Sequence, residues 1–296
     1  MSIEKMKNFA FEVDFMKQKY AVIGHPIGHT MSPFIHKSLF ELQGIEMEYF
    51  AFDIAPEKLG NEMNGVLGDL QGFNVTIPHK EAIIPFIDSV DESALKYNAV
   101  NCVLRRDGKT HGCSTDAYGF TQALKANNVP LSGRVLVLGA GGAARTLARE
   151  AADAGCEVTI AVRQSSLIKA EELKKWLISS DGKVSVCELK DVLGEFDLCV
   201  NATPVGMYPN PDAMPLTEGQ LKGCKALFDA VYNPEKTLLI KVAEGLGIKT
   251  VGGMAMLVWQ AVKAHEFWYG AEFKTADIEE IIEAANREME RIFYEK

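Results

Sequence analysis

The sequence predicts an α/β protein built from two domains, and two observations support this prediction. Short apolar runs alternate with helical segments along most of the chain, as in proteins whose parallel strands are joined by helices. A segment rich in turn residues, 127–133, then precedes a β-loop-α-β unit at 134–163. We therefore expect one α/β domain at 1–128, completed by C-terminal helices at 253–296, and a second α/β domain at 129–252.

Composition and charge limit the classes of function. The chain has 296 residues, of which 47% are hydrophobic and 24% charged, so it is long enough for one large or two medium domains with sizeable cores. A net charge of -9 disfavours nucleic acid or an anionic membrane as the main partner, whereas a small anionic substrate needs only a local basic pocket. No run approaches the ~20 apolar residues of a membrane span. A small-molecule partner is therefore expected.

The cysteines and the first residues indicate the compartment. The six cysteines are spread without C-x-x-C spacing, which favours reduced core thiols over a zinc site or a disulfide framework. Charged residues interrupt 1–18, so no signal-peptide core is expected there. Both observations favour a cytoplasmic protein.

The first domain is predicted to begin with a buried strand at 20–24. In the loop that follows, Ser32 is suited to cap a helix whose first position is Pro33, and this helix is expected to end near Gln43. Further strands are expected at 49–54 and 72–77, helical segments at 56–67, from 79 and from 116 to 127, and a hairpin that turns at 106–109.

Three polar residues of the chain, two in these segments and one near the C-terminus, have a simple local explanation besides any functional one. Lys80 lies in a first helical turn, where the helix dipole disfavours a cation, so either an anionic partner or solvent exposure is expected. Asp116 starts a helix, where the same dipole favours a carboxylate. Gln260, on a C-terminal helix, reads by default as a solvated or core-satisfied amide.

The unit at 134–163 predicts dinucleotide binding. An apolar strand at 135–138 is followed by a glycine loop, and then by a helix expected at 143–154. Gly139, Gly141 and Ala144 fit the pattern G-x-G-x-x-G/A, in which small residues allow a tight turn, close approach of a pyrophosphate and close packing of helix on strand. The helix N-terminus would then hold the phosphates.

The end of the second strand of this unit favours NADP over NAD. An NAD site usually has an acidic residue about 20 residues beyond the loop, whereas an NADP site uses arginine for the 2′-phosphate. Here Arg163 is followed by Ser165 and Ser166, and no acid occurs before Glu171. A solvated arginine at the end of a strand is the alternative.

Another loop is expected near the reactive end of the cofactor. It follows a strand at 196–201, and ligands of open α/β sheets bind beyond the carboxyl ends of the strands. The other elements expected after residue 163 are helices at 169–178, 237–245, 254–265 and 278–292, and strands at 184–187, 226–232 and 249–251.

Seven motifs in order along the chain carry a family resemblance. They are His29 to Pro33, Asn74 to Lys80, Ala99 to Asn101, Ser114 to Asp116, Gly139 to Gly142, Asn201 to Met207, and Tyr232 to Pro234 with Gln260. As a set they resemble the shikimate dehydrogenase family, whose members interconvert 3-dehydroshikimate and shikimate with a nicotinamide cofactor. The resemblance covers nearly the whole chain from Tyr20. It implies a substrate-binding domain at 1–128 with 253–296, and an NADP-binding Rossmann domain at 129–252.

The resemblance also implies a role for each residue. Lys80 and Asp116 would flank the reacting carbon, where the lysine either delivers a proton or stabilises the developing alkoxide. No metal is required. Substrate contacts are implied for Thr30, Ser32, Thr76 and Tyr232 at the carboxylate, and for Asn74, Asn101 and Gln260 at the ring hydroxyls. Cofactor contacts are implied for Gly139, Ala140, Gly141, Gly142, Ala143, Arg163, Thr203, Gly206, Met207 and Gly253.

Departures from the family pattern leave alternatives open. Thr30 stands where serine is usual, Ser114 and Ala117 replace Asn and Gly, and Gln164 replaces Thr beside the 2′-phosphate position. Besides an NADP-dependent shikimate dehydrogenase, a quinate or dual quinate/shikimate dehydrogenase using NAD is therefore considered. A non-catalytic ligand sensor is a further alternative, disfavoured because Lys80 and Asp116 are both present. A monomer or homodimer is expected.

Overall fold

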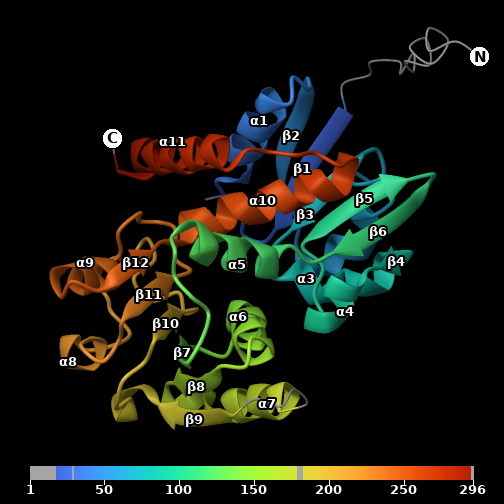
Figure 1. The fold of residues 1–296 in the computed structure, drawn as a ribbon. Helices are drawn as coiled ribbons and strands as arrows, with labels where there is room; N and C mark the ends of the chain where they lie inside the picture. Colours follow the sequence, from blue (N-terminus) through green and yellow to red (C-terminus); the bar gives the residue numbers. More distant parts are fainter. Residues whose placement is uncertain (1–17, 29, 179–182, 295–296) are drawn as a thin grey trace, which may run out of the picture.

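The computed structural model describes residues 18–28, 30–178 and 183–294 of the chain. Within these ranges the protein forms two six-stranded sheets with helices packed around them (Figure 1), which confirms the predicted α/β class. His29, the first residue of one predicted motif, and residues 1–17 of the first predicted domain lie outside the described residues. No helix in these ranges is long and apolar enough to cross a membrane.

The first sheet is mixed, and its strand directions bring four segments to one edge. In the order β2-β1-β3-β5-β6-β4, β1 runs parallel to β2 and β3, whereas β5 is antiparallel to both β3 and β6. The carboxyl ends of β1, β3 and β6 therefore meet the amino end of β5 at the same edge. The strands are β1 Gln18–Gly24, β2 Met47–Asp53, β3 Gly72–Val75, β4 Ser89–Val90, β5 Cys102–Arg106 and β6 Lys109–Cys113.

The helices around this sheet correct two predictions. Ser32 is not the cap of its helix: the helix begins at Ser32, the cap position is Met31, and the Ser32 N–H is already bonded to Thr30 Oγ1 at 3.2 Å. The segment expected to be helical over 56–67 ends at Glu62, because Gly60 and Gly65 weaken a helix there. The helices are α1 Ser32–Leu42, η2 Pro56–Lys58, α2 Leu59–Glu62, α3 His79–Ala82, η3 Ile84–Phe86, α4 Glu92–Tyr97 and α5 Asp116–Ala126.

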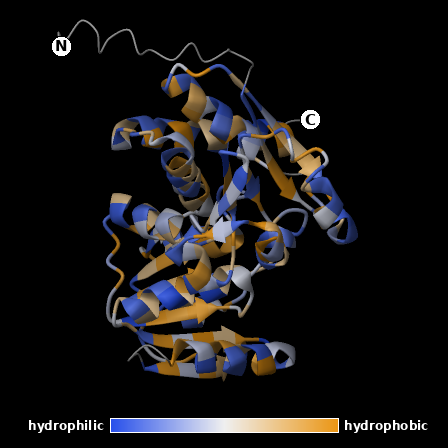
Figure 2. Ribbon diagram, turned by 90° about the vertical axis from the view of Figure 1, so that its right-hand side faces the viewer, coloured by the Kyte–Doolittle hydropathy of each residue, from blue (hydrophilic) through white to orange (hydrophobic). Residues whose placement is uncertain are grey.

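The second sheet is wholly parallel, with the order β12-β11-β10-β7-β8-β9. This is the doubly wound order of dinucleotide-binding folds, in which the strand order reverses between β7 and β10. Figure 2 shows its strands coloured mainly as hydrophobic residues, as expected for strands covered on both faces. The strands are β7 Arg134–Leu138, β8 Glu157–Val162, β9 Val184–Glu188, β10 Leu198–Asn201, β11 Ala226–Asp229 and β12 Lys249–Val251.

A buried carboxylate ends β11 earlier than the predicted residue 232. Asp229 is fully buried, and its oxygens accept hydrogen bonds from Asn201 Nδ2 at 2.9 Å, Thr237 Oγ1 at 2.7 Å and the Val231 N–H at 3.1 Å. The last bond turns the chain away from the strand direction. The remaining helices of this half are α6 Gly142–Asp153, η4 Gln164–Ser166, α7 Leu167–Leu177, η5 Leu189–Asp191, α8 Glu218–Leu221 and α9 Leu238–Gly245.

Two long C-terminal helices, α10 Gly253–Tyr269 and α11 Thr275–Phe293, return to the first sheet. Helix α10 passes between the two sheets and packs on α5 (Figure 1). Gly119 allows the close approach, because a Cβ there would lie 2.6 Å from the Met256 carbonyl oxygen. This packing brings Gln260 of α10 to the N-terminal end of α5.

Candidate active site

A lysine and a carboxylate form an ion pair at the carboxyl edge of the first sheet. Lys80 lies on α3, directly after β3, and Asp116 is the first residue of α5, directly after β6. Lys80 Nζ donates to Asp116 Oδ2 at 2.6 Å, and the two side chains are 29% and 16% exposed. The pair is therefore partly shielded from water yet open to a ligand.

An amide holds the other oxygen of this carboxylate. Asn101 precedes β5 and is buried, and its Nδ2 donates to Asp116 Oδ1 at 2.9 Å. Its Oδ1 accepts the Thr115 N–H at 2.7 Å, and Thr115 Oγ1 donates to Gln260 Oε1 at 3.2 Å. Residues at the starts of β5 and α5, with Gln260 of α10, thus form one polar network around Asp116, which fixes the carboxylate before any ligand binds.

Asn74, near the end of β3, lies beside this network. Its Nδ2 donates to the Asn101 carbonyl oxygen at 3.3 Å, and its Oδ1 accepts the Tyr49 hydroxyl at 2.7 Å. Thr76 follows β3 and packs over Gly24 at the end of β1, where an added Cβ would meet its methyl group at 2.6 Å. The structure thus brings Asn74 and Thr76 to the same edge as Lys80.

Three predicted substrate residues lie outside the hydrogen-bonded network. Thr30 and Ser32 are in the loop after β1 and the first turn of α1, and they are linked to each other through Thr30 Oγ1. Tyr232 follows β11 in the other half of the chain, and burial raises the pKa of its hydroxyl, which remains a donor. Among the described residues, no hydrogen bond joins these three side chains to the Lys80 pair.

A cavity of about 530 Å³ lies at the carboxyl edge of the second sheet, where the strand order reverses. It contains most of the predicted cofactor residues, namely Gly139, Ala140, Gly141, Arg163, Thr203, Gly206 and Met207. The lining excludes Gly142 and Ala143, which form the first turn of α6, and Gly253. Gly253 meets a packing demand instead, since a Cβ there would lie 2.4 Å from the Ala230 carbonyl oxygen.

The residues of this cavity fit a phosphorylated dinucleotide. A Cβ on Gly141 or Gly142 would meet no atom within 4 Å, so the space over the N-terminus of α6 is open to a pyrophosphate. Gly139 has a φ of +106°, which only glycine adopts readily. Arg163 is exposed just after β8, and its guanidinium has no partner among the described residues. It is therefore available to bind a 2′-phosphate.

Several residues at these sites have no role that the sequence alone predicts. Thr115 was part of a predicted motif, yet only tertiary contacts make it the link between Asn101 and Gln260. Leu189 and Tyr208 line the cofactor cavity. Tyr208 lies two residues beyond Gly206, so its place next to a predicted loop was the available signal. Leu189 follows β9, and nothing in its local sequence indicates a ligand.

Fold and site together define a two-domain α/β protein, with a lysine–carboxylate pair at the edge of the first sheet and a Rossmann-type cavity at the edge of the second. A family model for the shikimate dehydrogenase substrate binding domain matches residues 22–103. The shikimate dehydrogenase (NADP(+)) of Caldanaerobacter subterraneus is 37% identical over 268 residues, covering 88% of this chain and 95% of that protein. The enzyme of the same name from Methanopyrus kandleri is 41% identical over 274 residues, covering 88% and 93%.

Solved structures agree with the sequence comparison. The shikimate 5-dehydrogenase of Thermus thermophilus, in complex with NADP(H) and shikimate, is 35% identical with a TM-score of 0.79, covering 90% of this chain and 99% of that one. The chain belongs to the shikimate dehydrogenase family.

Proposed function

We propose that the chain is an NADP-dependent shikimate dehydrogenase, which reversibly reduces 3-dehydroshikimate to shikimate. The observation that carries this proposal is the contact of 2.6 Å between Lys80 Nζ and Asp116 Oδ2, with Asn101 holding the second carboxylate oxygen. A fixed ammonium group at the edge of the sheet suits a reaction in which a carbonyl oxygen becomes an alcohol.

The side chains of this site supply charge and position. When bound, NADPH supplies the hydride that reduces the substrate carbonyl. Lys80 would donate a hydrogen bond to the carbonyl oxygen, where it either delivers the proton that completes the alcohol or stabilises the alkoxide until solvent protonates it. Asp116 accepts from Lys80 and from Asn101, so the ammonium group keeps its position during the reaction.

The other polar residues would orient the substrate. Thr30 and Ser32 have hydroxyls at the carboxyl end of β1 and would bind the carboxylate, with Thr76 and Tyr232 as further donors. Asn74, Asn101 and Gln260 would bind the ring hydroxyls. This assignment is supported by the convergence of three strand ends and α10 on one edge.

The cavity in the second sheet supports most of the proposed cofactor residues, since seven of the ten line it. Gly139 to Ala143 would approach the pyrophosphate, Arg163 the 2′-phosphate, and Thr203, Gly206 and Met207 the nicotinamide end. Gly253 would act through packing near this site. We further propose that residues 1–128 with 253–296 form the substrate domain and 129–252 the NADP domain, because each range contains one of the two sheets.

We also propose a monomer or homodimer without nucleic-acid partners, in keeping with the net charge of -9. A reducing compartment such as the cytoplasm is supported by six unpaired cysteines, of which five are buried. Light scattering of the purified protein would measure the oligomeric state.

The proposal is tested by steady-state oxidation of shikimate and of quinate, each with NADP and with NAD. Fast turnover with shikimate and NADP is expected. Lys80→Ala should lower kcat by a factor of about 10² or more while leaving NADP binding intact. Lys37→Ala is the matched control, because Lys37 is 75% exposed and, among the described residues, forms an ion pair with Glu41 of the same helix alone.

Each possible result has a distinct meaning. Preference for quinate or NAD would show that the departures at Thr30, Ser114 and Gln164 change the specificity. Full activity of Lys80→Ala would refute the proposed role of the lysine. Binding of shikimate without turnover of either acid would favour a ligand sensor.

A further inference from the structure

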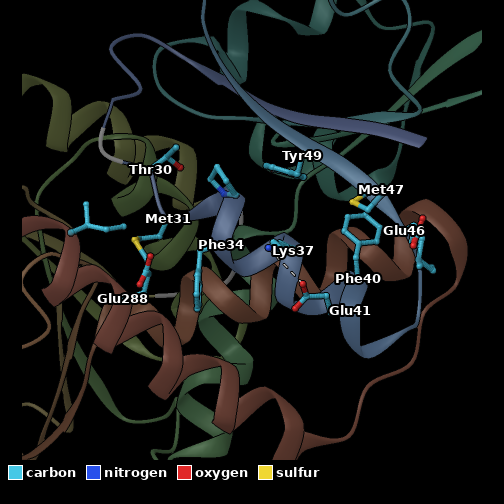
Figure 3. A pocket seen from close by; sticks show the side chains of 13 residues that line it. Thr30, Met31, Phe34, Lys37, Phe40, Glu41, Glu46, Met47, Tyr49 and Glu288 are labelled. Atoms are coloured by element: carbon cyan, nitrogen blue, oxygen red, sulfur yellow. Dashed lines mark ion pairs between the residues drawn. The ribbon is translucent and has the colours of Figure 1, made fainter. Parts of the chain in front are cut away.

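Tyr49 has a contact to the site that no local sequence pattern indicates. It lies on the edge strand β2, which pairs with β1. Its hydroxyl donates to Asn74 Oδ1 at 2.7 Å, and its ring lines a cavity of about 610 Å³ that also reaches Thr30. Figure 3 shows Tyr49 and Thr30 along the same side of this cavity, above helix α1 in that view. Tyr49 therefore lies between the surface cavity and the proposed substrate site.

The Tyr49 ring is held in place by a histidine of helix α1. It stacks on His36 of α1, with ring centroids 4.4 Å apart and an interplanar angle of 8°. His36 is itself fixed, because its Nδ1 lies 2.9 Å from His265 Nε2 on α10. Burial raises the pKa of the Tyr49 hydroxyl well above its ordinary value, so the hydroxyl stays protonated and can donate. Because the Tyr49 ring is stacked on a fixed neighbour, its hydroxyl is positioned more firmly than a polar group at the end of a flexible side chain would be.

The hydrogen bonds of Asn74 determine the orientation of its amide. One N–H of Nδ2 donates to the Asn101 carbonyl oxygen, and Oδ1 accepts from Tyr49. A flipped amide would place its own carbonyl oxygen against the Asn101 carbonyl oxygen, and two acceptors repel. Among the described residues, the second N–H of Nδ2 has no acceptor. The side chain therefore presents a donor, with its acceptor oxygen already in use.

We propose that Tyr49 is a positioning residue, whose hydroxyl fixes the Asn74 amide so that its remaining N–H binds a ring hydroxyl oxygen of the substrate. This inference rests on the proposed function. Tyr49 itself does not touch the substrate and acts through Asn74. The site therefore favours substrates that have a hydrogen-bond acceptor oxygen at this position.

The test is a double-mutant cycle on the full chain with Tyr49→Phe and Asn74→Ala. Tyr49→Phe keeps the stacked ring and removes the hydroxyl, so the KM for shikimate should rise about tenfold while the KM for NADP is unchanged. In the Asn74→Ala background the same substitution should have no further effect, because the residue through which it acts is absent. Tyr20→Phe is the control: Tyr20 is a buried tyrosine whose ring packs on Trp268 at an interplanar angle of 42°, and its hydroxyl bonds to Gln18 at 3.3 Å.

Several results would overturn the proposal. A tenfold rise in the KM for shikimate caused by Tyr49→Phe in both backgrounds would mean that Tyr49 acts independently of Asn74. An unchanged KM for shikimate in Tyr49→Phe, or an equal rise in the KM for NADP, would also contradict it. If Asn74→Ala does not fold, Asn74→Leu replaces it in the cycle, because leucine is similar in size to asparagine and can neither donate nor accept a hydrogen bond. The wild-type protein is assayed first, before any variant. If it fails to oxidise shikimate, the proposed function itself is refuted.

Discussion

The contact between α5 and α10 leads to a quantitative prediction for Gly119→Ala. An added Cβ would lie 2.6 Å from the Met256 carbonyl oxygen and 2.9 Å from Gln260 Cβ, and both atoms belong to a packed helix. Restoring an ordinary contact near 3.4 Å requires the helices to separate by roughly 0.8 Å. Overpacking of this kind costs about 1–3 kcal/mol, of which better helix propensity returns up to about 1 kcal/mol.

The same displacement reaches the site, because Gln260 accepts from Thr115 beside Asp116. We expect the Tm of Gly119→Ala to fall by about 2–6 °C. We expect kcat/KM for shikimate to fall by roughly tenfold or more, since a shift on the order of 1 Å can cost about a hundredfold.

Gly245→Ala is the matched control for this prediction. Gly245 also lies in a helix, and a Cβ there would meet no atom within 4 Å. That variant should keep full activity and an equal or slightly higher Tm. Thermal melting and steady-state kinetics of both variants decide the matter. If Gly119→Ala behaves like Gly245→Ala, close packing of α5 on α10 does not position Gln260.

Three further predictions concern the cofactor, the two halves of the chain and pH. Arg163→Ala should raise the KM for NADP about 10- to 100-fold and leave that for NAD nearly unchanged, since NAD lacks the 2′-phosphate; equal changes in both KM values would refute the assignment. Lys96 on α4 contacts Glu150 and Asp153 on α6 at 2.7 and 2.8 Å, so Lys96→Met should lower Tm by about 2–4 °C at low salt and by less at 1 M salt. A loss independent of salt would contradict an ionic contact. Burial lowers the pKa of His36 to about 3, below the ~6.5 of an unfolded histidine, so the unfolded chain binds more protons between these values. Protonation of His36 on unfolding should then lower the free energy of unfolding by about 2 kcal/mol from pH 7 to pH 5. His36→Asn should flatten this dependence of the free energy on pH, as measured by urea unfolding. An unchanged slope in that variant would show that His36 is not the group responsible.

Local chemistry made the dinucleotide unit predictable from the sequence. The apolar strand β7, the glycine turn and helix α6 are contiguous, and each depends on rules that act within a few residues. Arg163 is a candidate for the same reason, because its distance from the glycine loop is fixed by one helix and one strand, and its role stays a prediction. The hairpin between β5 and β6 was also foreseen, and its turn residues Asp107 and Gly108 have positive φ values of 53° and 72°.

Element ends were predicted less well where a side chain from elsewhere decides them. Ser32 has the residue type of a helix cap, yet the helix begins one residue earlier than expected, with Ser32 in its first turn and Met31 at the cap position. Thr30 Oγ1 accepts the N–H of Ser32, so a neighbouring hydroxyl satisfies one of the free N–H groups at the start of the helix. The strand β11 ends at Asp229 because bonds to Asn201 and Thr237 hold that carboxylate. Such partners are distant in sequence, so no local pattern contains them.

The sequence by itself determined the class of fold, the family motifs and the residue types that the chemistry requires. Only the tertiary structure decided which of them meet. Lys80, Asn101, Asp116 and Gln260 come together because strand direction in the first sheet and the crossing of α10 over α5 place them at one edge. Tyr49 reaches Asn74 for the same reason. Contacts of this kind depend on sheet register and helix packing, which are set by the whole core and not by any single segment.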